Sequence, residues 1–346
     1  MKEIKYLEDG RRKKSMKKKV VAVFLTAMLG CVMLAGCKKN VGTPEDNAVV
    51  EEEEEQDTEE KEGNLFGYSC IDIYNPYFDI LKESIRGELE AKGDTLLVKN
   101  PDGDAQKQIQ QIEEMIEEGV DAVFLSPVDW EAITPALEML DEAEIPVINV
   151  DTQVKETDLT EAYIGSDNKN AGAVCGENLK LQCPDGGKIV LLECPSQNSV
   201  NDRITGFEEA IKNAGFEVVV RADAGGNKAG AKEKMSAILK EHPQIDAVMC
   251  GNDQMALGAL EAAKEAGKTS LKIYGVDGSP ELKSELAKEK SMIAGSGAQS
   301  PINVGKQAAK IARAILAGED YEETTYVDTF FIGKENVEMY GTNGWQ

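Results

Sequence analysis

Charged, amide and aromatic side chains recur in this chain directly after short apolar segments. Asp151, for example, follows the mostly apolar residues 146–150, and Asp277 follows residues 273–276. Carboxylates accept hydrogen bonds, whereas amide and guanidinium groups can donate them. Together they suit a ligand with several hydroxyl groups, each of which donates and accepts. In chain order, the polar candidates of this kind are Asn75, Asp151, Arg203, Asn252, Asp277 and Gln299.

Two aromatic residues, Tyr77 and Phe78, stand two and three positions after Asn75. An aromatic ring can lie against the C–H face of a sugar ring, so both are candidates for ligand contact. Taken singly, a strand-end aspartate is more often a helix cap or a turn residue, and Phe78 suits an apolar core. The combination of residue types therefore carries more information than any one member.

Three further residues are candidates for ligand contact. Ser126 and Thr152 also follow apolar segments. Asp129 is expected to cap a helix, which would put Trp130 in its first turn, at the mouth of a binding cleft. The alternative for Trp130 is packing on the protein surface.

The segments between these candidates alternate between apolar runs and amphipathic stretches. Residues 65–70, 95–98, 122–125, 146–150, 188–192, 218–220, 247–250, 273–276 and 293–298 read as strands. Apolar residues spaced three and four apart, such as Ile109, Ile112 and Ile116, predict helices between them. Fully apolar strands that alternate with helices predict parallel sheets covered on both faces, an α/β fold.

Residues 64–346 are too many for one comfortable core, and the alternation restarts near residue 188, so we expect two similar doubly wound lobes. In such sheets ligands bind beyond the carboxyl ends of the strands. The candidate side chains all fall at those ends, so they should converge on one cleft.

The chain offers little for metal, redox or nucleophilic chemistry. It holds one histidine, His242, which disfavours a zinc site or a histidine triad. The five cysteines beyond residue 64 have no close metal-ligand spacing, so we read them as buried free thiols. Gly295-Ser296-Gly297 lacks the pattern of a nucleotide loop, and no cofactor is expected.

Arg203 should keep Asp151 and Asp277 ionised, which suits holding a ligand rather than hydrolysis, so we predict a binding protein and no enzyme.

The first residues read as a targeting signal. Lys17-Lys18-Lys19 precedes an apolar stretch that is too short for a comfortable membrane span, and Leu34-Ala35-Gly36-Cys37 resembles a bacterial lipobox. We therefore expect residues 1–36 to be removed and Cys37 to carry a lipid. The acidic residues before Met16 are unusual in a signal peptide, and Met16 is the expected true start. A plain secretory signal or a short anchor is the alternative.

Residues 37–63 are acidic and nearly free of apolar side chains, which predicts a disordered tether. The whole chain has a formal net charge of −25. Nucleic-acid binding needs basic patches, so a nucleic-acid partner is disfavoured.

Several stretches of residues 64–346 carry a resemblance to one family. They are Asn75-Pro76-Tyr77-Phe78, Val150-Asp151-Thr152, Gly165-Ser166-Asp167-Asn168, Arg203-Ile204-Thr205-Gly206-Phe207, the run from Gly251 to Ala259, and Gly275-Val276-Asp277-Gly278. In these residues the chain resembles periplasmic sugar-binding proteins of the ribose-binding type, the type I periplasmic binding proteins.

The resemblance implies a monomeric lipoprotein that captures a monosaccharide or polyol outside the cytoplasm and delivers it to an ABC-type permease. A sugar-sensing subunit for a membrane kinase or chemoreceptor is the alternative. It implies a hinge of three crossovers, near Ser166, Gln299 and Val327. The expected lobes are residues 64–166 with 300–327, and residues 167–299 with 328–346. Ligand contacts are implied at Asn75, Tyr77, Phe78, Asp151, Arg203, Asn252, Asp277 and Gln299.

The chain also departs from that family. Thr152 stands where ribose binders have an arginine, Ser126 replaces an asparagine, and Ile71 replaces a polar residue. The aromatic expected within residues 224–227 is absent. These departures weaken the case for ribose as the ligand.

Overall fold

The computed structural model describes residues 63–346. The expected signal segment, Cys37 and most of the acidic tether lie outside the described residues. Within residues 63–346, no helix is both long and apolar enough to cross a membrane.

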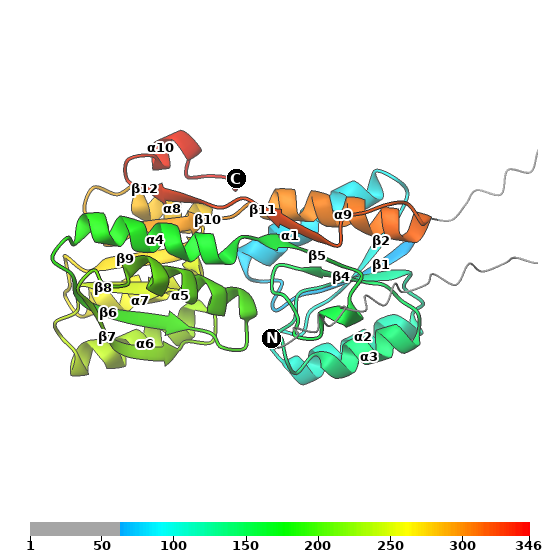
Figure 1. The fold of residues 1–346 in the computed structure, drawn as a ribbon, viewed down its shortest axis with the longest axis horizontal. Helices are drawn as coiled ribbons and strands as arrows, with labels where there is room; N and C mark the ends of the chain where they lie inside the picture. Colours follow the sequence, from blue (N-terminus) through cyan, green and yellow to red (C-terminus); the bar gives the residue numbers. More distant parts are fainter. Residues whose placement is uncertain (1–62) are drawn as a thin grey trace, which may run out of the picture. The chain divides into compact units, whose positions relative to one another are not determined.

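The first lobe is built on a six-stranded sheet in the order β11-β5-β4-β3-β1-β2 (Figure 1). All its neighbouring strands run parallel. The strands are β1 (Leu65–Ser69), β2 (Thr95–Lys99), β3 (Ala122–Leu125), β4 (Val147–Val150), β5 (Ala162–Ser166) and β11 (Thr324–Val327). Helices α1 (Pro76–Glu90) and α9 (Pro301–Ala317) pack on one face, α2 (Ala105–Glu117) and α3 (Thr134–Glu142) pack on the other, and the short η1 (Thr157–Leu159) follows β4. We call this the N-terminal lobe.

The second, C-terminal lobe repeats the plan with the order β12-β10-β9-β8-β6-β7. Only β12 runs antiparallel to its neighbour. The strands are β6 (Gly187–Glu193), β7 (Phe216–Asp223), β8 (Ala247–Cys250), β9 (Lys272–Asp277), β10 (Ile293–Ala298) and β12 (Phe330–Gly333). Helices α4 (Asn168–Gln182) and α5 (Asn198–Ile211) cover one face; α6 (Lys228–Glu241), α7 (Asp253–Glu265), α8 (Pro280–Leu286) and α10 (Val337–Tyr340) lie on the other.

The central strands are mostly apolar because helices bury both of their faces; the exception is Asn149 of β4, whose amide donates to the Leu125 carbonyl (3.0 Å) and the Thr152 carbonyl (2.8 Å). All four residues of β3, β4 and β8 are buried. A strand with one wet face would alternate between apolar and polar residues instead. The predicted α/β fold with two doubly wound, mostly parallel sheets is confirmed.

The chain passes between the two sheets three times, from β5 to α4, from β10 to α9 and from β11 to β12. Helix α9 thus returns to the N-terminal lobe, where it packs against α1. The carboxyl ends of the parallel strands, and the loops after them, therefore face the crossovers in both lobes.

Helix starts place two of the candidate site residues. Asn75 caps α1 by accepting a hydrogen bond from the Tyr77 amide (3.0 Å), and Pro76 occupies the first helical position, where its missing N–H costs nothing. Asn252 caps α7 by accepting from the Met255 amide (2.8 Å).

The start of α3 differs from our expectation. Asp129 accepts from the amides of Glu131 and Ala132, but this closes a separate turn, and α3 begins only at Thr134. Pro135, in the first helical turn, favours a start there because its missing N–H is tolerated only in that turn. Trp130 consequently lies in the turn before the helix, not in its first turn.

Candidate functional site

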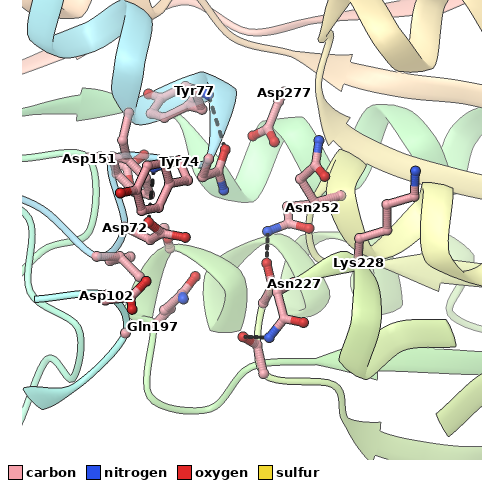
Figure 2. Close-up of a pocket in the computed structure, with 18 of the residues that line it drawn as sticks. Asp72, Tyr74, Tyr77, Asp102, Asp151, Gln197, Asn227, Lys228, Asn252 and Asp277 are labelled. Atoms are coloured by element: carbon pink, nitrogen blue, oxygen red, sulfur yellow. Dashed lines mark hydrogen bonds between the residues drawn. The ribbon is translucent and has the colours of Figure 1, made fainter. Parts of the chain in front are cut away.

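A cavity of about 270 Å³ is lined by loops of both lobes (Figure 2). Tyr77 and Asp151 of the N-terminal lobe face Asn252 and Asp277 of the C-terminal lobe across it. Of the eight residues implied by the resemblance, the ones that line this cavity are Asn75, Tyr77, Phe78, Asp151, Arg203, Asn252 and Asp277.

Arg203 lies between the two strand-end aspartates and is buried with them. Its guanidinium nitrogens are 3.8 Å from Asp151 Oδ1 and 3.6 Å from Asp277 Oδ1. Asp151 follows β4 of one lobe and Asp277 ends β9 of the other, and these two strands hold equivalent places in their sheets. One cation of the C-terminal lobe therefore bridges an anion from each lobe.

The Arg203 side chain is also fixed by two hydrogen bonds to groups other than the aspartates. Its Nε donates to Asn168 Oδ1 (2.8 Å), and NH1 donates to the Gly251 carbonyl (3.0 Å). Close packing of α4 on α5 sets the backbone beneath it, since a Cβ on Gly172 would lie 1.7 Å from the Arg203 carbonyl oxygen. The guanidinium is thus held in place before any ligand arrives.

Both aspartates adopt a backbone conformation that residues with a side chain rarely occupy. The φ angle is 62° at Asp151 and 139° at Asp277. Such strain persists only where the surroundings enforce it, and it gathers at functional sites. Here Gln299 Nε2 donates to Asp277 Oδ1 (2.8 Å), and the Tyr163 hydroxyl donates to the Asp151 carbonyl (2.8 Å).

Burial governs the charge state of this group. It raises the pKa of Asp277 to about 8; Arg203 acts to lower that pKa, while the nearby carboxylates Asp253 and Asp151 raise it further. Burial likewise raises the pKa of Asp151, against the opposing effects of Arg203, Thr152 and Tyr77. These upward shifts oppose our expectation that Arg203 keeps both carboxylates ionised, because one guanidinium offsets only part of the loss of water around several buried carboxylates.

The two amide side chains have donor groups to offer. Asn75 and Asn252 use their carbonyl oxygens as helix caps, which leaves their NH₂ groups as donors. Asn252 gives one N–H to the Gly226 carbonyl (2.8 Å), in the C-terminal-lobe loop that lines the cavity. Amide donors thus stand on both sides of the cavity.

Tyr77 forms the aromatic wall together with Phe78. Their rings meet edge to face, with centroids 5.4 Å apart. The Tyr77 hydroxyl is buried near Asp151, whose pKa it helps to lower, but it makes no hydrogen bond of standard geometry among the described residues. A buried hydroxyl without a partner is costly, and a polar ligand in the cavity would relieve that cost.

The remaining candidates lie outside the cavity lining. Gln299 is buried behind Asp277, and Thr152 shares a hydrogen bond with Ser199 of the other lobe (2.7 Å between hydroxyl oxygens). Ser126 is buried, and its hydroxyl has no partner within residues 63–346. Trp130 is half-buried; its amide donates to the Ser196 carbonyl of the other lobe (3.0 Å), and a contact between its ring and a ligand stays a prediction.

The structure adds residues that the sequence analysis did not single out. Asp72, Tyr74 and Asp102 line the cavity from the N-terminal lobe, and Gln197 and Ser199 line it from the C-terminal lobe. Gln197 and Ser199 follow β6, so the rule that ligands bind beyond strand ends could have found them. Tyr74 follows β1 and directly precedes the candidate Asn75, so the same rule could have found it, although 77% of its surface is exposed.

The described part of the chain holds no cluster of three or more histidine, cysteine or acidic side chains arranged to bind a metal ion. The five cysteines there are free thiols: Cys70, Cys175, Cys183, Cys194 and Cys250. Four of them are buried as expected, whereas Cys183, at the end of α4, is only half-buried. Burial raises the pKa of each, to about 12 for Cys70, so these thiols are unreactive near neutral pH.

Comparison with known proteins gives consistent matches. The model of the periplasmic binding protein domain matches residues 66–320. A ribose import binding protein of Bacillus subtilis is 31% identical over 259 residues, which cover 75% of this chain and 83% of that protein. An ABC transporter solute-binding protein of Mycobacterium smegmatis with bound glycerol has a TM-score of 0.76 and 28% identity, covering 80% of this chain and 96% of its own. The fructose-binding periplasmic domain of a hybrid two-component system has a TM-score of 0.74 and 27% identity, covering 80% and 93%.

Proposed function

Because the chain belongs to the periplasmic binding protein domain family, we propose that it captures a neutral monosaccharide or polyol between its two lobes. The resemblance drawn from the sequence is confirmed by this membership. The relatives described above are a ribose import binding protein, a solute-binding protein with bound glycerol and a fructose-binding domain, and these three ligands are uncharged and rich in hydroxyls.

One observation carries the proposal: Asp151 and Asp277, from different lobes, converge on Arg203 inside a shared cavity. Vicinal hydroxyls can donate to the carboxylates and accept from Arg203 and the two asparagine amides. The cavity, at about 270 Å³, falls just below the range of about 300–1,000 Å³ typical of drug-sized ligands, which favours one sugar ring over an oligosaccharide.

The charge of the lining argues against acidic ligands. Asp72, Asp102, Asp151 and Asp277 all line the cavity. Of the two basic residues there, Arg203 is committed to aspartates, and Lys228 pairs with Glu261 and Glu281. A sugar phosphate or uronate would bring a further negative charge into this field.

We infer that the three crossovers act as a hinge and that ligand stabilises the closed form by contacts to both lobes. The direct contacts between Thr152 and Ser199 and between Trp130 and Ser196 support closure as a defined state. In this proposal the aspartates hold the ligand and catalyse no reaction.

The family places the protein outside the cytoplasm. We propose that it is anchored there through a lipid on Cys37 and that it acts as a monomer. The closed form would dock on an ABC-type permease, as expected for a relative of import binding proteins.

A thermal-shift screen tests the ligand class. The purified protein is heated with pentoses, hexoses, polyols, uronic acids and sugar phosphates. At least one neutral compound should raise the melting temperature, because a ligand that binds only the folded state stabilises it. A shift by acidic sugars alone would contradict the proposal.

A role in sensing is the second candidate, supported by the similarity to the periplasmic domain of a two-component system. Deletion of the gene separates the two roles. Loss of uptake of the screened sugar indicates transport, whereas intact uptake with lost sugar-dependent gene expression indicates sensing.

A further inference from the structure

After α10, residues 341–346 form a segment that we call the tail, and it contacts both lobes (Figure 1). The C-terminal lobe holds it at both sides of Trp345. Lys283 Nζ of α8 donates to the Gly344 carbonyl (2.6 Å) and to Gln346 Oε1 (2.9 Å). Gln346 Nε2 donates to the Tyr340 carbonyl (3.2 Å). Ser300, which caps α9 at the crossover into the N-terminal lobe, donates through Oγ to the main-chain oxygen of Gln346.

Lys283 is unusual because no part of it is exposed. Burying an ammonium group is costly unless acceptors replace its water shell. The tail supplies two such acceptors, the Gly344 carbonyl and Gln346 Oε1, so Lys283 binds the tail at a defined position. Burial lowers the pKa of Lys283, while nearby Asp253 acts to raise it.

Between these anchors, Trp345 packs against the apolar cluster of α1 and α9 in the N-terminal lobe. Its ring meets the ring of Tyr77 edge-on, with centroids 5.9 Å apart at 73°. Trp345 is absent from the cavity lining, whereas Tyr77 is part of it. The tryptophan therefore supports the tyrosine ring from outside the cavity.

The orientation of the Tyr77 ring depends on such support. Its hydroxyl lies close enough to Asp151 to help lower the pKa of that carboxyl, but it makes no hydrogen bond of standard geometry within residues 63–346, so polar contacts hold the ring only weakly. The aromatic contacts recorded for it are those with Phe78 and Trp345. Edge-to-face pairs prefer defined geometries, so two of them can hold the ring in place.

We propose that Trp345 is a positioning residue of the ligand site: anchored by Lys283, the tail holds Trp345 against Tyr77 and so fixes the aromatic wall of the cavity. This inference rests on the proposed function, since it assigns a role in ligand binding. It also ties that wall to the C-terminal lobe, because Lys283 and Tyr77 belong to different lobes.

Two measurements on Trp345→Ala test the inference. Hydrogen exchange of the ligand-free protein should rise by about fivefold in the first turns of α1, because the support of that turn is lost. Affinity for whichever of D-ribose, D-allose and myo-inositol best stabilises the wild type should fall about three- to tenfold. Trp345→Phe should retain most of the exchange protection in α1 and most of the sugar affinity, and Lys283→Met should reproduce the Trp345→Ala changes.

Tyr340→Ala is the matched control. Tyr340 stacks on Phe330 within the C-terminal lobe, and its carbonyl still accepts from Gln346 after the substitution. It should leave exchange in α1 and sugar affinity unchanged. If Trp345→Ala leaves either α1 exchange or affinity unchanged, the inference is overturned. A wild-type protein that no neutral sugar or polyol of the thermal-shift screen stabilises contradicts the proposed function instead, while the exchange result still decides the contact between Trp345 and Tyr77.

Discussion

At the scale of residues, the site is a buried charge cluster whose members differ in their effect on stability. Arg203 is the cation beside both Asp151 and Asp277, so its removal would leave two buried carboxylates without a cationic partner. Asp277, by contrast, lies near the carboxylates of Asp253 and Asp151, which carry the same charge, and burial raises its pKa. A residue that binds ligand well can thus lower the stability of the empty protein.

Replacing Asp277 with asparagine should therefore have opposite effects on stability and on binding. We expect Asp277→Asn to raise the melting temperature of the ligand-free protein at pH 8, because it removes a buried charge. Sugar affinity should fall by about 1.5–3 kcal/mol, through loss of a charged acceptor. Thermal melts and calorimetry check both, with the exposed Asp185→Asn as control. A lower melting temperature with unchanged affinity would argue against this role.

Stability should also depend on pH through Asp277. Its pKa is raised in the folded state from an ordinary value of 3.8 to about 8. The folded protein then binds more protons than the unfolded chain between those values, so the contribution of Asp277 to stability is lost as pH rises through that window. Denaturant unfolding from pH 4 to 8 should show a smaller fall in unfolding free energy for Asp277→Asn than for wild type. Parallel curves would mean that Asp277 has an ordinary pKa.

The strand-end rule identified most of the polar residues around the cavity, because their position follows from local sequence. It could not separate Gln299, which is buried behind Asp277, from residues that line the cavity. The sequence also predicted a helix that starts at Asp129, with Trp130 in its first turn. In the structure Asp129 closes a separate turn, and α3 begins only at Thr134. Those outcomes depend on packing between segments far apart in the chain.

At the scale of elements, the loop between β1 and α1 carries an aromatic that composition alone does not reveal. Tyr74 lines the cavity yet is 77% exposed, and it precedes the helix cap Asn75 (Figure 2). The loop of the other lobe, at Gly225 and Gly226, offers no side-chain bulk. A ring in the cavity would therefore gain apolar contact chiefly from the N-terminal lobe.

We expect Tyr74 to cover the ligand when the lobes close. Tyr74→Ala should weaken sugar binding by about 0.5–1.5 kcal/mol, through loss of ring contact, without lowering the melting temperature of the ligand-free protein. Tyr326→Ala, which removes another exposed tyrosine outside the cavity lining, serves as control for surface effects. Equal affinities in calorimetry for Tyr74→Ala and wild type would show that Tyr74 stays in solvent.

Some elements were not predicted, and their sequences explain why. Helix α4 contains Gly172 and Gly176, which allow close packing on α5 but weaken the helical pattern. Strands β11 and β12 have four residues each and are partly exposed at the sheet edges. Strand β11 lacks the apolar run that marked the central strands, whereas β12 has such a run in Phe330, Phe331 and Ile332 that our sequence analysis did not identify.

At the scale of the whole molecule, the alternation of strands and helices was enough to predict the fold class. The return of α9 to the N-terminal lobe is a different matter, because its apolar face would suit either sheet. Trp345 shows the same limit: it follows the C-terminal lobe in sequence but packs on the N-terminal lobe. Local pattern predicts elements, and long-range packing decides which lobe receives them.

Anchoring concerns a residue outside the described part of the chain. Cys37→Ser should release the protein into the medium or leave its precursor unprocessed, because the lipobox cysteine is the expected lipid attachment site. Cys31→Ser, upstream in the signal segment, is the control and should fractionate like the wild type. Membrane fractionation with palmitate labelling checks this, and a Cys37→Ser protein that is still labelled and membrane-bound would rule out the lipobox.

Isothermal calorimetry with the best neutral sugar or polyol tests the central claim most directly, on wild type, Asp151→Asn and Asp277→Asn. The claim is that one ligand bridges an aspartate from each lobe. It predicts one binding site per chain and a loss of affinity of roughly tenfold or more in each variant, since each removes a charged contact. Full affinity in either variant, with the fold intact, would mean that the ligand is held by one lobe or elsewhere, and the account would be wrong.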